Sequence, residues 1–130
     1  MKIAVRYYSR SGNTKALAEA IAKAADTAAV SVDAPEAPIR EPVDLLFLGG
    51  ALYAYGLDSH MKDFLKTLDK AKVKKAVVFS TSWISKHALD LLKKGLAEAG
   101  IPVEAETLYA KNKPSAEQLK AAEGFTRKYL

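Results

Sequence analysis

Short apolar runs alternate with amphipathic helical segments along the whole chain. Strands are predicted at the apolar runs Lys2–Tyr8, Ala28–Val32, Val43–Gly49, Ala76–Ser80 and Val103–Tyr109. Helices are predicted where apolar residues recur every three or four positions, at Asn13–Ala25, Ser59–Leu68, Lys86–Ala99 and Ser115–Tyr129. Such alternation over 130 residues indicates one α/β domain, residues 1–130, with a doubly wound parallel sheet and helices on both faces.

In sheets of this class, ligands bind beyond the carboxyl ends of the strands, where the strand order reverses. The loops after the first, third and fourth predicted strands should therefore lie together at one edge. These three loops also have the most unusual compositions in the chain. We expect a ligand site to be built from them.

The first of these loops is rich in hydrogen-bond donors and leads directly into a helix. It runs from Ser9 to Thr14 with the sequence Ser-Arg-Ser-Gly-Asn-Thr. A helix N-terminus has unpaired amides and a dipole that favours anions, and Gly12 lets the backbone approach a ligand closely. The loop lacks the Gly-Lys-Ser/Thr ending of a Walker A motif and the glycines of a dinucleotide motif. A phosphate monoester is the expected ligand, and a plain capped helix start is the alternative.

The other two loops have aromatic residues and glycines where a flat ligand would lie. After the third strand comes Gly-Gly-Ala-Leu-Tyr-Ala-Tyr-Gly, with Tyr53 and Tyr55 placed either to stack on a ligand or to cover the sheet as core. After the fourth strand come hydroxyl residues and Trp83, the only tryptophan, which would lie beside a heterocycle or be buried under the next helix.

The first loop also resembles a known family motif. Tyr-Tyr-Ser-Arg-Ser-Gly-Asn-Thr, ending at Thr14, resembles the FMN-phosphate loop of flavodoxins, (Ser/Thr)-x-(Ser/Thr)-Gly-Asn-Thr, and the order of elements agrees along the whole chain. The resemblance implies a five-stranded sheet in the order 2-1-3-4-5 and non-covalently bound FMN. It assigns the phosphate to Ser9, Arg10, Ser11, Gly12, Asn13 and Thr14. It assigns the flavin ring to Ala51, Leu52, Tyr53, Ala54, Tyr55 and Gly56 on one side and to Thr81, Ser82 and Trp83 on the other.

The resemblance further implies how the protein would tune the cofactor, which itself supplies the redox chemistry. In flavodoxins a backbone carbonyl after the third strand turns toward the flavin on reduction, and Gly56, then Gly50, are the candidates for that position. Tyr53, Tyr55 and Trp83 are the candidates for stacking on the ring. No residue is assigned as catalytic or as a metal ligand.

The charge of the chain departs from the family pattern. Typical flavodoxins are strongly acidic, whereas this chain has a net charge of +5, and Ser82, Trp83 and Ile84 stand where acidic residues and a tyrosine are usual. We expect a less negative reduction potential, because less negative charge opposes the anionic reduced flavin. The motif Gly-Ala-x-x-x-Tyr-Gly, ending at Gly56, also resembles the corresponding loop of flavodoxin-fold oxidoreductases, including the flavodoxin-like protoporphyrinogen oxidases. The long insertion that those oxidases carry is absent from this sequence.

Three functions are compatible with these features. The first is an electron carrier between a reductase and a terminal oxidoreductase, the second an FMN-dependent enzyme that reduces a small substrate such as a quinone, and the third a flavin-free α/β binding module.

Dispersed lysines argue against nucleic acid as a partner, and the sequence has no cysteine, no signal-peptide pattern and no membrane-length apolar run. A cytoplasmic monomer with redox protein partners is expected.

Arg6 and two histidines raise separate questions. Arg6 lies in a predicted central strand, where an unpaired guanidinium would be costly, so we expect a carboxylate partner, Asp33 or Asp44, or an exit at the strand end. His60 and His87 lie near helix starts, and surface or capping roles are expected for both.

Overall fold

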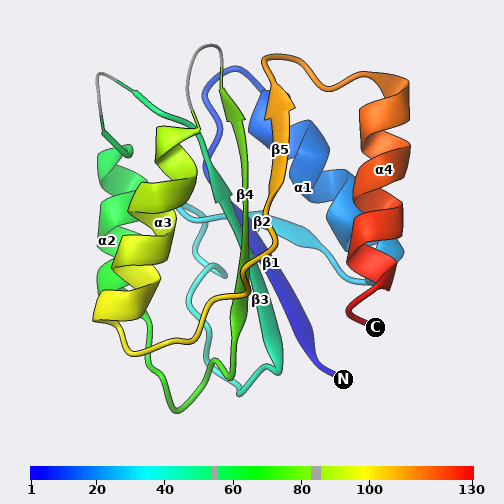
Figure 1. The fold of residues 1–130 in the computed structure, drawn as a ribbon. Helices are drawn as coiled ribbons and strands as arrows, with labels where there is room; N and C mark the ends of the chain where they lie inside the picture. Colours follow the sequence, from blue (N-terminus) through cyan, green and yellow to red (C-terminus); the bar gives the residue numbers. More distant parts are fainter. Residues whose placement is uncertain (54–55, 83–85) are drawn as a thin grey trace.

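The computed structural model describes residues 1–53, 56–82 and 86–130, with the backbone alone at Ser82. The described residues form a sheet of five parallel strands in the order β2-β1-β3-β4-β5, as predicted (Figure 1). The strands are β1 (Ile3–Tyr7), β2 (Ala29–Ser31), β3 (Leu45–Gly50), β4 (Ala76–Ser82) and β5 (Leu108–Lys111). The helices are α1 (Asn13–Ala24), α2 (Ser59–Thr67), α3 (His87–Glu98) and α4 (Ala116–Arg127).

Two helices cover each face of the sheet, α1 with α4 on one side and α2 with α3 on the other (Figure 1). The central strand β3 shows why its sequence is almost entirely apolar. Leu45 and Phe47 pack into the core beneath α1 and α4, whereas Leu46 and Leu48 pack into the core beneath α2 and α3. A strand buried on both faces needs apolar residues at every position rather than at alternate ones.

The helix starts follow capping rules, with one exception at the candidate site. Asp58 caps α2 by accepting a hydrogen bond from the amide of His60, and Ser115 forms a capping box with Gln118 at the start of α4. At α1 the cap position is Gly12, in the left-handed region with φ 92°, and no side chain caps the helix. The amides of Thr14 and Lys15 in the first turn of α1 are therefore left for another partner.

The last strand differs most from its predicted position. Val103, the first residue of the predicted strand, forms only an isolated bridge with Ala76, and β5 itself begins five residues later at Leu108. The strand β4 extends to Ser82, two residues beyond its predicted end, and pairs there with Lys111. Residues 108–111 are consequently brought to the carboxyl edge of the sheet.

The prediction that Arg6 pairs with the carboxylate of Asp33 or Asp44 is wrong. Its guanidinium donates from Nε to the backbone oxygen of Ala37 at 2.7 Å and from Nη1 to that of Val5 at 3.2 Å. Asp33 instead accepts from Ser31, and Asp44 accepts from the amide of Lys2. Arg6 is partly buried, and burial lowers its pKa, an effect that the charge of Glu36 opposes. Backbone carbonyls thus satisfy a guanidinium for which the sequence pattern suggested a carboxylate.

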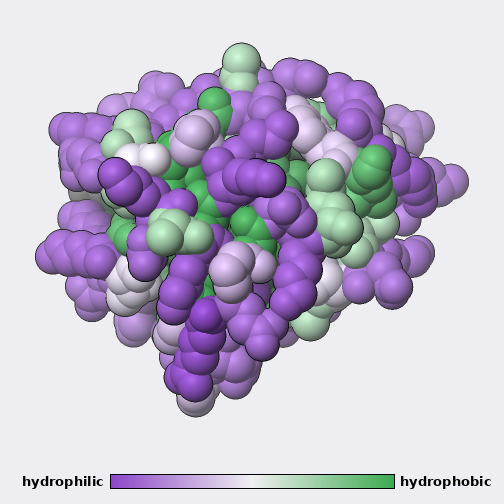
Figure 2. All heavy atoms as spheres, turned by 90° about the horizontal axis from the view of Figure 1, so that it is seen from below, coloured by the Kyte–Doolittle hydropathy of each residue, from purple (hydrophilic) through white to green (hydrophobic). Residues whose placement is uncertain are grey.

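Both chain ends lie at the amino ends of the strands, opposite the edge where the three loops gather (Figure 1). Figure 2 looks onto this amino-end face, where hydrophilic side chains surround a smaller central area of hydrophobic ones. Among the described helices, none combines the length and the apolar character that a membrane span requires.

Candidate functional site

The strand register brings the predicted loops to one edge of the sheet. Tyr7 of β1 lies opposite Gly49 of β3, and Gly50 lies opposite Ser80 of β4, so the chain leaves the three central strands at nearly the same level. The first two loops begin there, and the third begins just beyond, at the end of β4. Three of the residues assigned to the ring, Ala54, Tyr55 and Trp83, lie outside the described residues.

The start of α1 presents donors and no negative charge. The first helical hydrogen bond runs from the amide of Ala16 to the oxygen of Gly12, so the amides of Thr14 and Lys15 have no partner within the helix. Ser9 Oγ accepts from the amide of Gly12 at 2.9 Å, which leaves its own hydroxyl proton free to donate. The first turn contains no acidic residue. This donor set fits an anion such as a phosphate.

A buried pair of hydroxyls joins the start of α1 to the end of β4. Thr14 Oγ1 and Thr81 Oγ1 lie 2.6 Å apart, and the two residues are 1% and 3% exposed. One hydroxyl donates in such a pair, and the proton of the other must find a different acceptor. The sequence predicted both threonines at the site, and the structure adds that they contact each other. The loop from Ser9 to Thr14, named the phosphate loop for its expected ligand, is therefore held directly against the end of β4.

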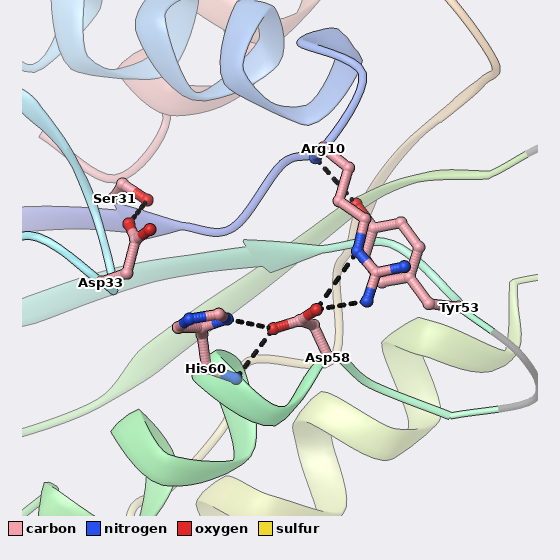
Figure 3. A network of polar contacts seen from close by, with 6 residues as sticks. All are labelled: Arg10, Ser31, Asp33, Tyr53, Asp58 and His60. Carbon is pink, nitrogen blue, oxygen red and sulfur yellow. Dashed lines mark hydrogen bonds and ion pairs between the residues drawn. The ribbon is translucent and has the colours of Figure 1, made fainter.

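Asp58 links the first two loops through a cluster of polar contacts, shown in Figure 3. Its side chain is 5% exposed, and one carboxylate oxygen accepts from Arg10 Nε at 3.2 Å and from Arg10 Nη2. The other accepts from the amide of His60 at 2.8 Å and contacts His60 Nδ1 at 2.7 Å. Burial by itself would raise the pKa of Asp58, but the hydrogen bonds from Arg10 and His60 outweigh it and lower the pKa. Asp58 directly precedes the helix predicted at Ser59–Leu68, and its ion pair with Arg10 was not apparent from the sequence.

Tyr53 lies against the phosphate loop. The Arg10 guanidinium carbon is 4.0 Å from the centre of the Tyr53 ring, and the amide of Arg10 donates to the Tyr53 hydroxyl at 3.1 Å. Tyr53 is partly buried, and burial raises its pKa against the opposing effect of Arg10. One guanidinium thus contacts both the aromatic ring of Tyr53 and the carboxylate of Asp58, as Figure 3 shows.

The backbone of the second loop closes on itself. The amide of Tyr53 donates to the oxygen of Gly56 at 2.7 Å, and the amide of Gly56 donates to the oxygen of Tyr53 at 2.9 Å. The carbonyl of Gly56, a candidate for the turn toward the flavin, is therefore held by Tyr53. A rotation of this carbonyl would first break that hydrogen bond.

The two glycines at the end of β3 have different surroundings. A Cβ atom added to Gly49 would lie 2.0 Å from the ring of Phe79, so the core itself requires glycine at this position. A Cβ atom added to Gly50 would meet only Met61 Cε, at 3.7 Å, which is an ordinary contact. Packing therefore accounts for Gly49, and it leaves Gly50 without a packing requirement.

The histidines lie at helix starts, as expected. His87 is the first residue of α3. His60 is in the first turn of α2, and its ring stacks on Tyr8 with centroids 4.9 Å apart and planes inclined by 12°. The sequence did not reveal this stacking, because Tyr8 and His60 lie on separate elements and belong to no shared motif.

Comparisons with known proteins agree with this geometry. A family model described as a flavodoxin domain matches residues 4–115. The chain is 31% identical over 129 residues to a diflavin flavoprotein (A 2) of Thermosynechococcus vestitus, an alignment that covers 91% of this chain and 22% of that protein. The chain thus spans about a fifth of the length of this relative.

Solved structures of flavodoxins have the same fold as this chain. A flavodoxin from the domain Archaea has a TM-score of 0.83 at 25% identity, covering 98% of this chain and 95% of that one. Oxidised flavodoxin 1 of Bacillus cereus has a TM-score of 0.80 at 25% identity, covering 99% and 97%. The rubredoxin oxygen:oxidoreductase of Desulfovibrio gigas shares the fold, with a TM-score of 0.84 at 16% identity, and this chain covers 34% of it. The family match and the flavoprotein relative support FMN as the cofactor. The chain belongs to the flavodoxin domain family.

Proposed function

We propose that the chain holds FMN at the carboxyl edge of its sheet and carries electrons between a reductase and a terminal oxidoreductase. The observation that carries the proposal is the start of α1, where free amides and hydroxyl groups converge without an acidic residue. Such a donor set suits the phosphate of FMN. The loops that follow β3 and β4 at the same edge of the sheet contain the glycines and aromatic residues that suit a flat ring.

The phosphate is assigned to the residues of the first loop, Ser9, Arg10, Ser11, Gly12, Asn13 and Thr14. The ring is assigned to residues 51–56 and 81–83, on the flavodoxin resemblance together with the position of these loops at the sheet edge. When bound, FMN supplies one- and two-electron transfer. The protein contributes the phosphate donors, the restraint of Tyr53 by Arg10, and the Thr14–Thr81 contact between the phosphate loop and the end of β4.

The proposal is tested by titrating purified protein with FMN and with riboflavin while following the quenching of flavin fluorescence. Thr14→Val removes one hydroxyl from the phosphate loop and should weaken FMN binding about tenfold, the effect of losing one hydrogen bond to a charged group. Riboflavin lacks the phosphate, so its affinity should change far less. Thr27→Val, an exposed position just beyond the other end of α1, is the matched control and should leave both affinities unchanged.

Protein that quenches neither flavin would refute the FMN site. An equal loss of FMN and riboflavin affinity in Thr14→Val would refute the assignment of the phosphate to this loop. If the FMN-loaded protein alone rapidly reduced a quinone with NAD(P)H, the proposed function would change from an electron carrier to an FMN-dependent enzyme. The reduction potential, the cytoplasmic location and the monomeric state stay predictions.

A further inference from the structure

We propose that lysines around the carboxyl ends of β4 and β5 form a docking surface for an acidic redox protein. This lysine rim consists of Lys15, Lys86, Lys111 and Lys113. The inference rests on the proposed function, because the rim borders the loops that are assigned to FMN. It adds the class of partner and the surface to which that partner binds.

The rim is tied to both assigned loops by specific contacts. Lys111 is paired in register with Ser82, the last residue of β4. Asn112, which follows it in the left-handed region with φ 57°, accepts a hydrogen bond at 3.3 Å from Asn13 of the phosphate loop. Lys111 and Lys113 therefore flank a residue that touches the phosphate loop, and Lys15 follows Asn13 in the first turn of α1.

Lys86 completes the rim from the side of α3. It occupies the cap position of that helix, and its Nζ lies 5.2 Å from the centre of the Tyr109 ring on β5. Tyr109 and Lys111 are two residues apart on one strand, so their side chains point to the same face of the sheet. Lys86 and Lys111 thus lie on the same side of the edge strand β5.

The charges of the rim are not neutralised within the described part of the chain. All four lysines are exposed, and none forms an ion pair with a described residue. The lysine ion pairs that do occur in this part lie at the opposite end of the molecule, as Lys2–Glu41, Lys23–Glu123, Lys74–Asp44, Lys75–Glu104 and Lys128–Glu106.

Few carboxylates oppose the rim. Three exposed carboxylates, Glu19, Asp90 and Glu117, lie four residues after Lys15, Lys86 and Lys113, and none of them is ion-paired with a described residue. Asp90 and Glu117 lie in the first turns of α3 and α4, where helix dipoles favour them. Asp58 is buried and bound to Arg10 and His60. Asp33 lies just beyond β2, which is the other edge of the sheet. The four rim lysines thus outnumber the three exposed carboxylates beside them, Glu19, Asp90 and Glu117, and leave a small excess of exposed positive charge at this end of the molecule.

An excess of exposed cations beside a redox site selects its partner by charge. Unpaired surface lysines contribute little to stability, but together they raise the rate of encounter with a negatively charged surface. The partner must bring its own redox centre close to the flavin loops, which a nucleic acid does not possess. The occupant that fits is a small redox protein with an acidic face.

The test uses an acidic plant-type [2Fe–2S] ferredoxin as the probe and the ¹⁵N-labelled FMN-loaded protein. The double variant Lys111→Glu/Lys113→Glu reverses two rim charges. Lys70→Glu/Lys72→Glu is the matched control, because it has the same spacing and the same charge change at the amino-end face. Affinity is measured at about 0.02 M and about 0.5 M NaCl, which span strong and weak interaction between surface charges.

The rim variant should bind the ferredoxin at least about tenfold more weakly at low salt, the control should stay within about twofold, and high salt should remove the difference. Amide shifts should map to residues 108–115 and the start of α1. Equal losses in both variants, or binding that salt does not change, would overturn the proposal. Tighter binding of random duplex DNA than of ferredoxin at the same salt would overturn it in favour of nucleic acid.

Failure of the FMN site gives a different result from failure of the docking surface. FMN quenching is read on the same samples, so loss of flavin binding is visible independently of ferredoxin binding. Titration of the flavin-free protein with ferredoxin tests the rim even if FMN does not bind. Normal FMN binding with no preference for the rim would refute the docking surface alone.

Discussion

Asp58 should make folding stability depend on pH through its charge. Asp58→Asn keeps a cap acceptor for α2 but removes the negative charge that faces Arg10 and His60, and it should cost about 2 kcal/mol near pH 6. The folded pKa of Asp58 is lowered, so its contribution is present above the ordinary carboxyl pKa of about 3.9 and is lost as the pH falls through the folded value.

Urea unfolding at several values between about pH 6 and pH 2 measures this difference. The free energies of unfolding of wild type and Asp58→Asn should converge as the pH falls. Asp63→Asn, exposed in the same helix and outside the ion pairs of the described residues, is the control. A stability difference for Asp58→Asn that does not change with pH would show that the charge contributes nothing.

The two glycines at the end of β3 should respond differently to alanine. Gly49→Ala places a methyl group against the ring of Phe79 and should destabilise the protein by about 1–3 kcal/mol. Gly50→Ala has ordinary space beside Met61 and should change the free energy of unfolding by less than about 1 kcal/mol. Thermal unfolding of the flavin-free variants measures both. Similar melting temperatures for the two variants would contradict this account of the packing.

The residue-level contacts that the sequence missed join positions far apart in the chain. Arg6 binds the carbonyl of Ala37, 31 residues away, and Arg10 binds Asp58, 48 residues away. A local pattern identifies a buried cation and its need for acceptors, but it does not identify which loop supplies them. The assignment of a phosphate to the first loop could be proposed from the sequence because its candidate donors are consecutive, from Ser9 to Thr14, and this assignment stays a prediction.

At the level of elements, the Thr14–Thr81 contact should couple α1 to β4. In the flavin-free protein, Thr14→Val and Thr81→Val each leave one buried hydroxyl without its partner and should each cost about 1–2 kcal/mol. The double variant should cost less than the sum of the two, with a coupling of about 1 kcal/mol. Urea unfolding of all four proteins completes the cycle. Strict additivity would mean that the two hydroxyls do not stabilise each other.

Most helices and strands were predictable from the sequence, but the bounds of β5 were not. Helix starts at Ser59 and near Ser115 follow from capping residues that act locally. The extent of β5 depends on pairing with β4, because a strand exists only where its neighbour accepts its hydrogen bonds. The apolar character of residues 103–109 suggested a strand there, whereas pairing with the longer β4 shifts it to Leu108–Lys111.

For the whole molecule, FMN should raise the stability of the fold by mass action. A ligand that binds only the folded protein stabilises it by about 2.7 kcal/mol at one hundred times its dissociation constant. The melting temperature should therefore rise with FMN concentration, and it should rise less for Thr14→Val at the same concentration. Differential scanning fluorimetry with free phosphate as a control measures this. A melting temperature that is unchanged by excess FMN would contradict the assigned site.

The overall architecture was predictable because strand and helix periodicities repeat along the chain, whereas the distribution of charge was not. A net charge of +5 says nothing about which end of the molecule holds unpaired lysines. That distribution depends on ion pairs such as Lys75–Glu104, which form only when β4 and the segment before β5 come together.

The position of the chain ends has a consequence for how such a unit can be combined with others. Both termini emerge at the amino ends of the strands, on the side opposite the loops assigned to the cofactor (Figure 1). A further domain, an affinity tag or a surface anchor joined at either terminus would start from that opposite side and leave cofactor entry unobstructed. Similar units make up about a fifth of the diflavin flavoprotein and 34% of the rubredoxin oxygen:oxidoreductase chain. The placement of both ends thus permits a fusion at either terminus that does not cover the loops assigned to the cofactor.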